Sequence, residues 1–478
     1  MFDSLLDEDA TTMAALIRSG EVSACELTGA ALERMAKREP TIQAFCTPTP
    51  DLAMAQARAL DARRARGETL GALAGVPLAV KDLICTASVR TTSGSAAYRD
   101  FVPEEDDITV ERLLAADAIL LGKTTAPEFG YSAVGHNPLF PSPRNPWDPE
   151  MTPGGSSAGS GAAVAARLCP IALGSDGGGS VRIPAAHCGI FGFKASMGRV
   201  PLWPGCRDER YPGVSSWESL EHIGPMTRSV RDAALMMSLM AGPDMRDRHS
   251  IPCSDVDWLG ALRQPASKLR IAFSADLGYV AVDPEVRAVV SAAVQGFAAE
   301  TGAELELANP GFSDPAAAFG ALVAMESDLT GMRQMMAEQG SAMSPHLIAM
   351  LQREWRAENF TDAIAVRKAV SNSLWRFMQR YDLLITPTLA VPPFPLGSQG
   401  PEIIAGRMVR SDHWLSFCYP FNFTGQPAAS VPAGFTARGL PVGLQIVGRH
   451  LDDALVLAAS AAFERIQPWN HLQPGITQ

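Results

Sequence analysis

The sequence predicts an α/β fold: one large domain built on a central twisted mixed β-sheet that helices cover on both faces. Short apolar runs that suit buried strands alternate with stretches of helical apolar spacing along most of the 478 residues. The composition, 47% hydrophobic and 19% charged, is typical of a globular protein with a large core. No internal repeat or flexible linker divides the chain, so we expect a single domain over residues 1–478.

The first part of the chain, about residues 1–65, is expected to be helical. Apolar residues such as Met13 and Ile17 recur at helical spacing over residues 9–37, with an interruption at Gly20. This pattern predicts two amphipathic helices before the first strands of the sheet.

The pattern changes from residue 71, where we expect the core of the domain to begin and to extend to about residue 245. GALAGVPLAVKDL (71–83) places a Gly-Val-Pro turn before a β-rich run, and DAILLGKTTAPEFG (117–130) repeats a short strand followed by a polar loop. LCPIAL (168–173) is apolar throughout and suits a buried strand. The three runs are typical of strands in an α/β fold.

The second half of the chain continues the alternation. KLRIAFSADLG (268–278) predicts a strand, and Asp283-Pro284 is a good cap and first turn for a helix that precedes the alternating strand AELELA. Residues 315–380 are helical by composition. Further strands are expected at YDLLITPT (381–388), SVPAG (430–434) and LPVGLQIVG (440–448), before a last helix from Asp452.

The net charge and the lack of targeting signals limit the binding partners and the cellular compartment that we expect. The net charge is −11 and no lysine or arginine run occurs, which argues against a nucleic-acid or anionic-membrane partner. No apolar run is long enough to span a membrane, and the N-terminus lacks the features of a signal peptide. The eight cysteines include no C-x-x-C pair. We therefore expect a reduced cytoplasmic protein, a monomer or homodimer, that acts on a small molecule.

A glycine- and serine-rich segment, GGSSAGSG (154–161), offers the first candidate for chemistry. It lacks the Gly-Lys-[Ser/Thr] ending of a phosphate loop and the G-x-S-x-G spacing of a nucleophile elbow. Two further features accompany it: Lys81 ends an apolar strand, and Ser180 follows three glycines, 24 residues after Ser156. A different serine chemistry therefore has to be considered beside a Ser-His-Asp hydrolase, which no nucleophile-elbow motif supports.

With these features the chain resembles the amidase signature family. The resemblance rests on blocks in the family's usual order across most of the chain: GVPLAVKD (75–82), GKTTAPEFG (122–130), PGGSSAGSGAAVAARLCPIALGSDGGGSVRIPAAHCGIFGFKAS (153–196), HIGPMTRSVRDAALMMSLMAGPD (222–244), YDLLITPT (381–388) and FNFTGQPAASVPAGFTARGLPVGLQIVG (421–448). A single glycine-rich block would be weak support, whereas all of them together are specific.

The resemblance implies a Ser-Ser-Lys triad: Ser180 is the nucleophile, Ser156 relays protons and is preceded by a cis peptide bond, and Lys81 is the base. A serine hydroxyl is a poor nucleophile until a base removes its proton. A lysine acts as that base only when neutral, which requires its pKa to fall by roughly 3 units, or about 4 kcal/mol. Burial beside Val80, Leu83 and Ile84 could supply much of this shift.

The resemblance also assigns the supporting residues. The backbone N–H groups of Gly177, Gly178, Gly179 and Ser180 would form the oxyanion hole. Ser157, Asp176 and Arg182 would brace the loop, and no metal or organic cofactor is required. Two positions depart from the common pattern: Ala158 replaces a glycine, and Gly177 stands where a larger residue is often found. The second departure suggests a wider acyl site.

The substrate is the least determined part of the prediction. The resemblance implies an amidohydrolase that acts on a small neutral amide. The aromatic residues within 200–221 favour an aryl amide, an anilide or a carbamate (urethane) as substrate. Esterase activity is expected as a further activity of the same site. Residues 200–221 are either the rim of the substrate cleft or an ordinary surface loop. The candidate substrate-binding residues are Gly155, Trp203, Arg207, Tyr211 and Trp217.

Several alternatives accompany this prediction. The same triad fits a glutaminase-like subunit of a tRNA-dependent amidotransferase complex. His187 and His222 lie inside family blocks and are expected to be structural. The methionines Met325, Met332, Met335 and Met336 either pack in the core or line an adaptable apolar pocket.

Overall fold

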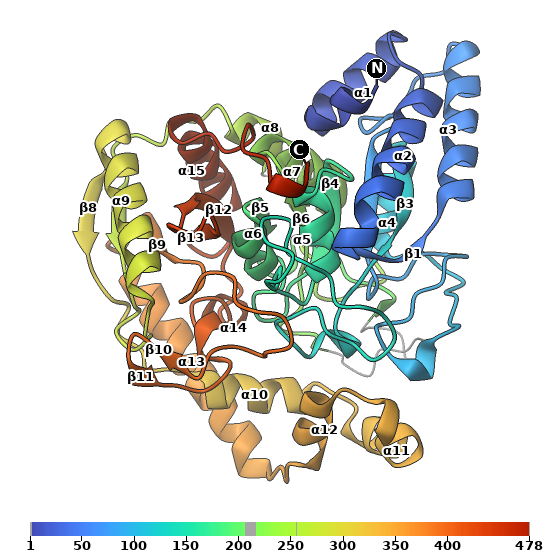
Figure 1. Ribbon diagram of the computed structural model, residues 1–478. Helices are drawn as coiled ribbons and strands as arrows, with labels where there is room; N and C mark the ends of the chain where they lie inside the picture. The colour runs from blue at the N-terminus through green and yellow to red at the C-terminus, as the bar shows by residue number, and fades with distance from the viewer. Residues whose placement is uncertain (1, 206–216, 255, 478) are drawn as a thin grey trace.

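The computed structural model describes residues 2–205, 217–254 and 256–477 (Figure 1). Within these ranges one eleven-stranded sheet runs in the order β1-β3-β2-β4-β6-β5-β12-β13-β9-β7-β8. Its strands are β1 (Phe45–Pro48), β2 (Pro77–Lys81), β3 (Ile119–Thr124), β4 (Ile171–Ser175), β5 (Phe191–Lys194), β6 (Ile223–Thr227), β7 (Arg270–Phe273), β8 (Glu304–Leu307), β9 (Leu383–Pro387), β12 (Ala428–Phe435) and β13 (Pro441–Val447). A separate hairpin pairs β10 (Ile403–Ile404) with β11 (Arg407–Met408).

The sheet is mixed, as predicted. Strand β2 is parallel to β3 and β4, and β7 is parallel to β8 and β9. The strands between these two groups pair antiparallel, from β4 and β6 through β12 and β13 to β9. Because β2 and β4 are parallel neighbours, their carboxyl ends lie at the same edge of the sheet. Polar residues that follow either strand are therefore brought together.

Helices cover both faces of this sheet. The helices are α1 (Ala10–Ser19), α2 (Ala24–Ile42), α3 (Pro50–Ala65), α4 (Ile108–Ala115), α5 (Ala158–Ala165), α6 (Arg182–Cys188), α7 (Val230–Met240), α8 (Trp258–Ala261), α9 (Pro284–Thr301), α10 (Ala316–Met325), α11 (Leu329–Gln339), α12 (Pro345–Gln352), α13 (Ala357–Phe377), α14 (Pro420–Phe423) and α15 (Asp453–Ile466). A Cβ on Gly443 would lie 2.5 Å from Ala186 of α6, and one on Gly448 would lie 2.7 Å from Val456 of α15. Side chains five residues apart along a strand point to opposite faces, so α6 and α15 lie on opposite sides of the sheet.

The expected helices and strands are confirmed in both halves of the chain. Helix α1 ends at Gly20, which has a φ of 83° that glycine adopts without strain. Helix α9 begins at Pro284, and the Asp283 side chain caps it by accepting a hydrogen bond from Glu285 N at 2.8 Å.

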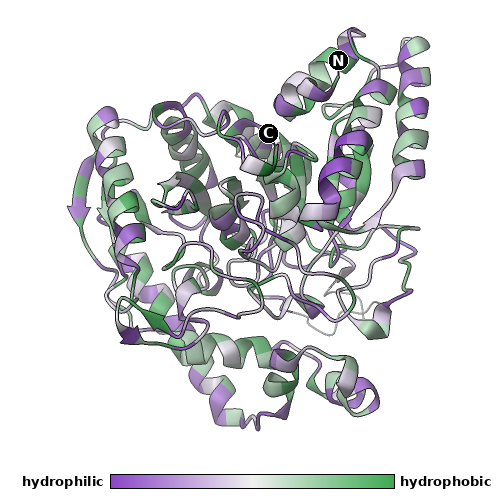
Figure 2. Ribbon diagram, in the orientation of Figure 1, coloured by the Kyte–Doolittle hydropathy of each residue, from purple (hydrophilic) through white to green (hydrophobic). Residues whose placement is uncertain are grey.

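Strand β8 is an edge strand, and most of its residues are exposed. Leu307 is 78% exposed there, so the alternating pattern of AELELA marks the sheet edge rather than a half-buried strand. Figure 2 shows hydrophilic and hydrophobic residues side by side on β8 and along the neighbouring helix α9.

The helical segment predicted over residues 315–380 divides into α10, α11, α12 and α13. In Figure 1 helices α10, α11 and α12 lie below the strands, next to one end of α13. Met332 is fully buried in a cluster with Phe129, Met343, Leu347 and Leu351, whereas Met325 is 38% exposed. No helix in the described ranges is long and apolar enough to cross a bilayer.

Candidate active site

The last residue of β2, Lys81, is fully buried at the carboxyl edge of the sheet. Its Nζ donates hydrogen bonds to Ser156 Oγ at 2.6 Å and to Ser175 Oγ at 2.8 Å. Burial lowers the pKa of Lys81 to about 8, while the carboxylates of Glu221 and Asp176 oppose this shift. At pH 7 about one in ten of the Lys81 amines is therefore neutral and can accept a proton.

The expected cis peptide bond joins Gly155 to Ser156, immediately before α5. The neighbouring Ser157 holds three parts of the site together. Its hydroxyl donates to the Ser175 carbonyl at 3.2 Å and accepts from the Ser175 N–H at 3.2 Å. Its backbone N–H donates to the Ser180 carbonyl at 3.3 Å. Ser157 thus joins the end of β4 to the loop that carries Ser180.

Ser175 is a contact of the buried lysine that the sequence reasoning missed. It ends β4, directly before Asp176, and β4 pairs in parallel with the strand that carries Lys81. The sequence contains one signal for this contact, a polar residue at the end of the apolar run LCPIALGS. Neighbouring parallel strands have their carboxyl ends at the same edge of a sheet, so such a residue can lie near the end of the next strand.

The loop before Ser180 folds around the carboxylate of Asp176. That carboxylate accepts hydrogen bonds from the backbone N–H groups of Gly179 at 2.7 Å and Val181 at 3.2 Å. The Gly179 amide is thus engaged within the loop, which gives it a different role from the other three predicted oxyanion donors. Ser180 itself is 8% exposed.

Arg182 completes this support from the first turn of α6. Its guanidinium donates to Asp176 through Nε and Nη2, both at 2.9 Å, and neither side chain is exposed. Burial would raise the pKa of Asp176, but the charge and hydrogen bonds of Arg182 outweigh it and hold that pKa below its usual range. The pair therefore stays ionised at the start of the loop that carries Ser180.

Two further residues, Asn422 and Gln445, complete the surroundings of Arg182. Its Nη2 donates to Asn422 Oδ1 at 2.6 Å and its Nη1 donates to Gln445 Oε1 at 2.7 Å. Both amides lie in the block 421–448, more than 200 residues away in the chain, and the sequence reasoning gave them no role. A buried guanidinium has five N–H donors to satisfy, and these amide oxygens accept two of them.

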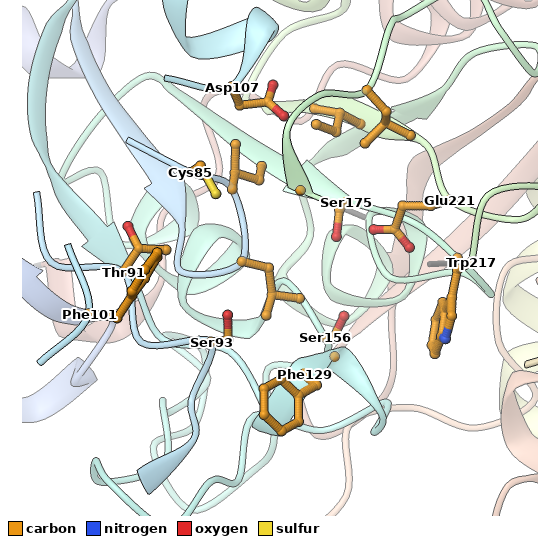
Figure 3. Close-up of a pocket in the computed structure, with 17 residues that line it drawn as sticks. Cys85, Thr91, Ser93, Phe101, Asp107, Phe129, Ser156, Ser175, Trp217 and Glu221 are labelled. Atoms are coloured by element: carbon orange, nitrogen blue, oxygen red, sulfur yellow. The ribbon is translucent and has the colours of Figure 1, made fainter. Parts of the chain in front are cut away.

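A pocket is lined in part by Ser156 and Ser175 (Figure 3). It contains about 810 Å³ of space between protein atoms, part of it open to solvent. In Figure 3 Ser156, Ser175, Trp217 and Glu221 lie on one side, and Cys85, Thr91 and Phe101 lie across from them. The other described residues that line it are mainly apolar: Leu83, Ile84, Phe129, Leu202 and Ile223, with Ser93, Asp107, Gly130, Gly177 and Gly205. Lys81 and Ser180 are not among the described residues that line it.

The structure corrects the expectation that Gly177 widens the site. A Cβ on Gly177 would lie 2.2 Å from Cε3 of Trp217 and 2.8 Å from a carboxylate oxygen of Glu221. The space that a larger residue would occupy is therefore filled by the Trp217 ring, which is itself 8% exposed. Trp217 donates through Nε1 to the Tyr131 hydroxyl at 3.2 Å, and the two rings meet edge to face at 5.0 Å.

The other predicted substrate-binding residues have different outcomes. Gly155 packs against the backbone of residues 133 and 134, and a Cβ there would lie 2.9 Å from Val134. Trp203 is half-buried, with the Arg246 guanidinium over its ring at 5.1 Å. Neither residue is among the described residues of the pocket wall. Arg207 and Tyr211 lie outside the described residues.

The two histidines inside the matched blocks are buried and neutral. His187 stacks on Trp414 with ring centres 5.4 Å apart, and burial lowers its pKa to about 3. Burial together with the nearby Lys194 also depresses the pKa of His222. Both histidines have the surroundings of structural residues, as expected. Within the described part of the chain, no three metal-ligating side chains lie close enough together to hold a metal ion.

Comparisons with known proteins cover nearly the whole chain. The family described as Amidase matches residues 26–457. An acylamidase of Rhodococcus erythropolis is 38% identical over 97% of this chain and 96% of its own length. A glutamyl-tRNA(Gln) amidotransferase subunit from Thermosynechococcus vestitus is 36% identical over 95% of this chain and 97% of its own. A crystal structure of a bacterial aryl acylamidase of the amidase signature family superposes with a TM-score of 0.89 at 31% identity, covering 97% of this chain and 96% of that one.

Proposed function

Because the chain belongs to the amidase signature family, whose members hydrolyse carbon–nitrogen bonds, we propose that it cleaves a small neutral amide through an acyl-enzyme on Ser180. The observation that carries this proposal is the 2.6 Å hydrogen bond between the buried Lys81 Nζ and Ser156 Oγ. This contact supports the proposal because a buried amine of lowered pKa can exchange a proton with the Ser156 hydroxyl.

In the proposed acylation, Ser180 Oγ attacks the amide carbonyl carbon and passes its proton to Ser156 Oγ, while Ser156 passes its own proton to neutral Lys81. The Lys81 ammonium then returns a proton through Ser156 to the leaving nitrogen, and the C–N bond breaks. A water molecule repeats the sequence on the acyl-enzyme, which releases the acid and restores Ser180. Lys81 therefore acts as base in the first half of each step and as acid in the second half.

The negative charge that forms on the carbonyl oxygen needs backbone donors. We assign the oxyanion hole to the N–H groups of Gly177, Gly178 and Ser180, since the Gly179 N–H donates to Asp176. One such donor contributes about 3–4 kcal/mol to the transition state in known hydrolases.

An aryl amide, an anilide or a carbamate is the proposed substrate class. The pocket wall supports this choice because it combines the rings of Phe101, Phe129 and Trp217 with aliphatic side chains. Aromatic and aliphatic surface favours an uncharged, flat substrate over a strongly charged one. The acylamidase and aryl acylamidase relatives also support it. Esterase and urethanase activities are part of the same proposal, because an acyl-enzyme mechanism does not depend on the leaving atom being nitrogen.

A second candidate is a glutaminase-like subunit of a tRNA-dependent amidotransferase. Relatives with that description are as similar to this chain as the acylamidase is, over as much of its length. Such a subunit would act with partner chains, whereas we propose that this chain works alone as a monomer or homodimer. A location in the cytoplasm fits the seven described cysteines, all of which are free thiols.

A screen of the purified protein separates the two candidates. The panel contains matched acetanilides, primary amides, esters, carbamates and glutamine, with Ser180→Ala and Lys81→Ala as blanks. A free-standing hydrolase releases aromatic amine from the anilides or carbamates, and both blanks lose this activity. Ammonia from glutamine alone, dependent on added partner subunits, would favour the amidotransferase role. Unchanged anilide hydrolysis in both variants would contradict the proposed triad.

A further inference from the structure

Asn422, a fully buried residue of the short helix α14, contacts three separate parts of the candidate site. Its Nδ2 donates to the backbone carbonyl of Asp176 at 2.7 Å, to Asp176 Oδ1 at 2.9 Å and to the Leu220 carbonyl at 3.2 Å. Its Oδ1 accepts from Arg182 Nη2 at 2.6 Å. One amide thus joins the nucleophile loop, the start of α6 and the segment that enters β6.

The contact with the Asp176 carbonyl determines the direction of a neighbouring N–H group. A trans peptide is planar, and its C=O and N–H point in opposite directions. The carbonyl of Asp176 and the N–H of Gly177 belong to the same peptide. When Asn422 holds that carbonyl on the inner side of the loop, the Gly177 N–H is directed to the other side, where Gly177 lines the pocket.

The backbone of His222 holds the same peptide from another direction. Its N–H donates to the Asp176 carbonyl at 3.2 Å, and the Asp176 N–H donates to the His222 carbonyl at 2.7 Å. This pair continues the antiparallel register of β4 and β6, in which Ser175 lies opposite Ile223. Asn422 adds the shortest hydrogen bond at this carbonyl, which also lies 3.3 Å from the ring Nδ1 of His222. A substitution of Asn422 can remove that shortest bond.

From this geometry we propose that Asn422 is a positioning residue for the oxyanion hole: it fixes the 176–177 peptide so that the Gly177 N–H faces the carbonyl oxygen of the substrate. The proposal rests on the proposed function, in which Gly177 is an oxyanion donor. Asn422 acts through this peptide and through Asp176, and it does not touch the reacting atoms.

The competing explanation is that Asn422 only accepts a hydrogen bond from the buried Arg182 guanidinium. Gln445 provides the matched control for this explanation. Gln445 is also fully buried, and its Oε1 accepts from Arg182 Nη1 at 2.7 Å. Its Nε2 donates to Thr386 Oγ1 at 3.1 Å and to the Phe417 carbonyl at 2.9 Å, away from the nucleophile loop. Asn422→Asp and Gln445→Glu each keep the acceptor oxygen for Arg182, remove the donating NH₂ and add one carboxylate.

The test compares these two variants in the full-length protein. Steady-state kinetics with the best anilide of the screen gives kcat and KM separately. Reaction with a fluorophosphonate, in which Ser180 Oγ bonds to phosphorus and fluoride leaves, gives a second rate that is independent of substrate identity. Thermal unfolding reports stability. Where Asn422→Asp does not fold, Asn422→Ala against Gln445→Ala gives the same comparison.

We expect Asn422→Asp to lower kcat and the phosphonylation rate by about 100-fold, as loss of one oxyanion donor does in known hydrolases, with KM changed by less than about 3-fold. Gln445→Glu should lower kcat by less than about 10-fold at a similar loss of thermal stability. Equal losses of kcat in the two variants, or a change confined to KM, would overturn the positioning role alone. A parent protein that hydrolyses no amide and does not react at Ser180 would overturn the proposed function, and the positioning role with it.

Discussion

Ser175 Oγ lies 2.8 Å from the Nζ of Lys81, at the end of the strand adjacent to the one that carries the lysine. The lysine therefore has two hydroxyl partners, Ser175 and Ser156, and both lie on the wall of the same pocket. A buried amine held by two hydroxyl groups has a fixed direction as well as a lowered pKa, and proton transfer depends on both.

Ser175→Ala should lower kcat by roughly 10- to 100-fold, because a hydrogen bond to a charged group is worth about 1.5–3 kcal/mol. Loss of this acceptor destabilises the Lys81 ammonium, so the pH at which activity is half-maximal should also fall. Kinetics over a range of pH measure both effects. Ser160→Ala is the control, since Ser160 is equally buried but its hydroxyl donates to the Leu173 carbonyl. Identical profiles for the two variants would contradict the role given to Ser175.

The activity should rise with pH and reach half of its maximum near pH 8. Burial lowers the pKa of Lys81 to about 8, and the proposed base is the neutral amine, whose fraction grows as pH increases through that value. Glu221→Gln should move the profile to lower pH, because the Glu221 carboxylate opposes the lowering of this pKa. The measurement is kcat/KM between pH 6 and 10. A shift to higher pH in Glu221→Gln would contradict this assignment.

Gly177→Ala should impair both folding and activity. The new Cβ would lie 2.2 Å from Cε3 of Trp217, and overpacking of this kind costs about 1–3 kcal/mol. Trp217→Phe removes the ring atoms that the Cβ would meet, so the double variant Gly177→Ala with Trp217→Phe should recover stability and part of the activity. Thermal unfolding and anilide kinetics on the four proteins test this. If the losses of stability and activity in the double variant equal the sum of those in the single variants, the two residues do not compete for space.

The smaller ring in Trp217→Phe alone should enlarge the pocket beside Gly177. The variant should therefore gain relative activity toward anilides with bulkier groups, compared with the parent on the same series. The readout is the ratio of kcat/KM for a large and a small anilide. An unchanged ratio would place the substrate away from Trp217.

Asp107→Asn should stabilise the protein increasingly as pH rises from about 4 to 7. Burial raises the pKa of Asp107 to about 7, so the folded state binds a proton that the unfolded state releases above its ordinary pKa. The parent therefore loses up to about 1.4 kcal/mol per pH unit in this window from this group. Asparagine can still accept the capping hydrogen bond from Thr109 N, which is 2.8 Å long in the parent. Thermal unfolding at pH 5 and pH 7.5 measures the difference.

Asp244→Asn is the control for this pH dependence. Hydrogen bonds from Arg246 lower the pKa of Asp244 to about 2, so its stabilising effect is lost only as pH falls through that range. Asp244→Asn should therefore lower the stability of the protein by the same amount at pH 5 and at pH 7.5. A pH-independent effect of Asp107→Asn over the same interval would contradict the raised pKa of the buried carboxyl.

Local sequence patterns were sufficient to predict the helices and strands and to single out candidate reacting groups. Apolar periodicity placed strand β2 and helix α9, because a strand or helix must present one apolar face to the core wherever it lies. Contiguous motifs placed Ser156 and Ser180, since the glycines that shape each loop stand beside the serine in the chain. The resemblance that these motifs carry supplied the partner Lys81.

The contacts between distant segments could not be derived in this way. Asn422 and Gln445 approach Arg182 from more than 200 residues away, and Trp217 fills the space beside Gly177. Gly177 by itself suggested a wider acyl site, but the Trp217 ring occupies the space beside it. A periodic pattern shows that a face is buried but not which side chain covers it.

The sequence by itself thus determined the α/β class and the order of the elements, because these depend on local spacing, and the family resemblance of its motifs implied the residues of the candidate triad. Only the tertiary structure decided that Ser175 holds the lysine, that the Gly179 amide binds Asp176, and that Asn422 directs the 176–177 peptide. The physical reason is that hydrogen bonds and close packing form between atoms within a few ångströms of each other, and that proximity results from folding all segments onto one sheet.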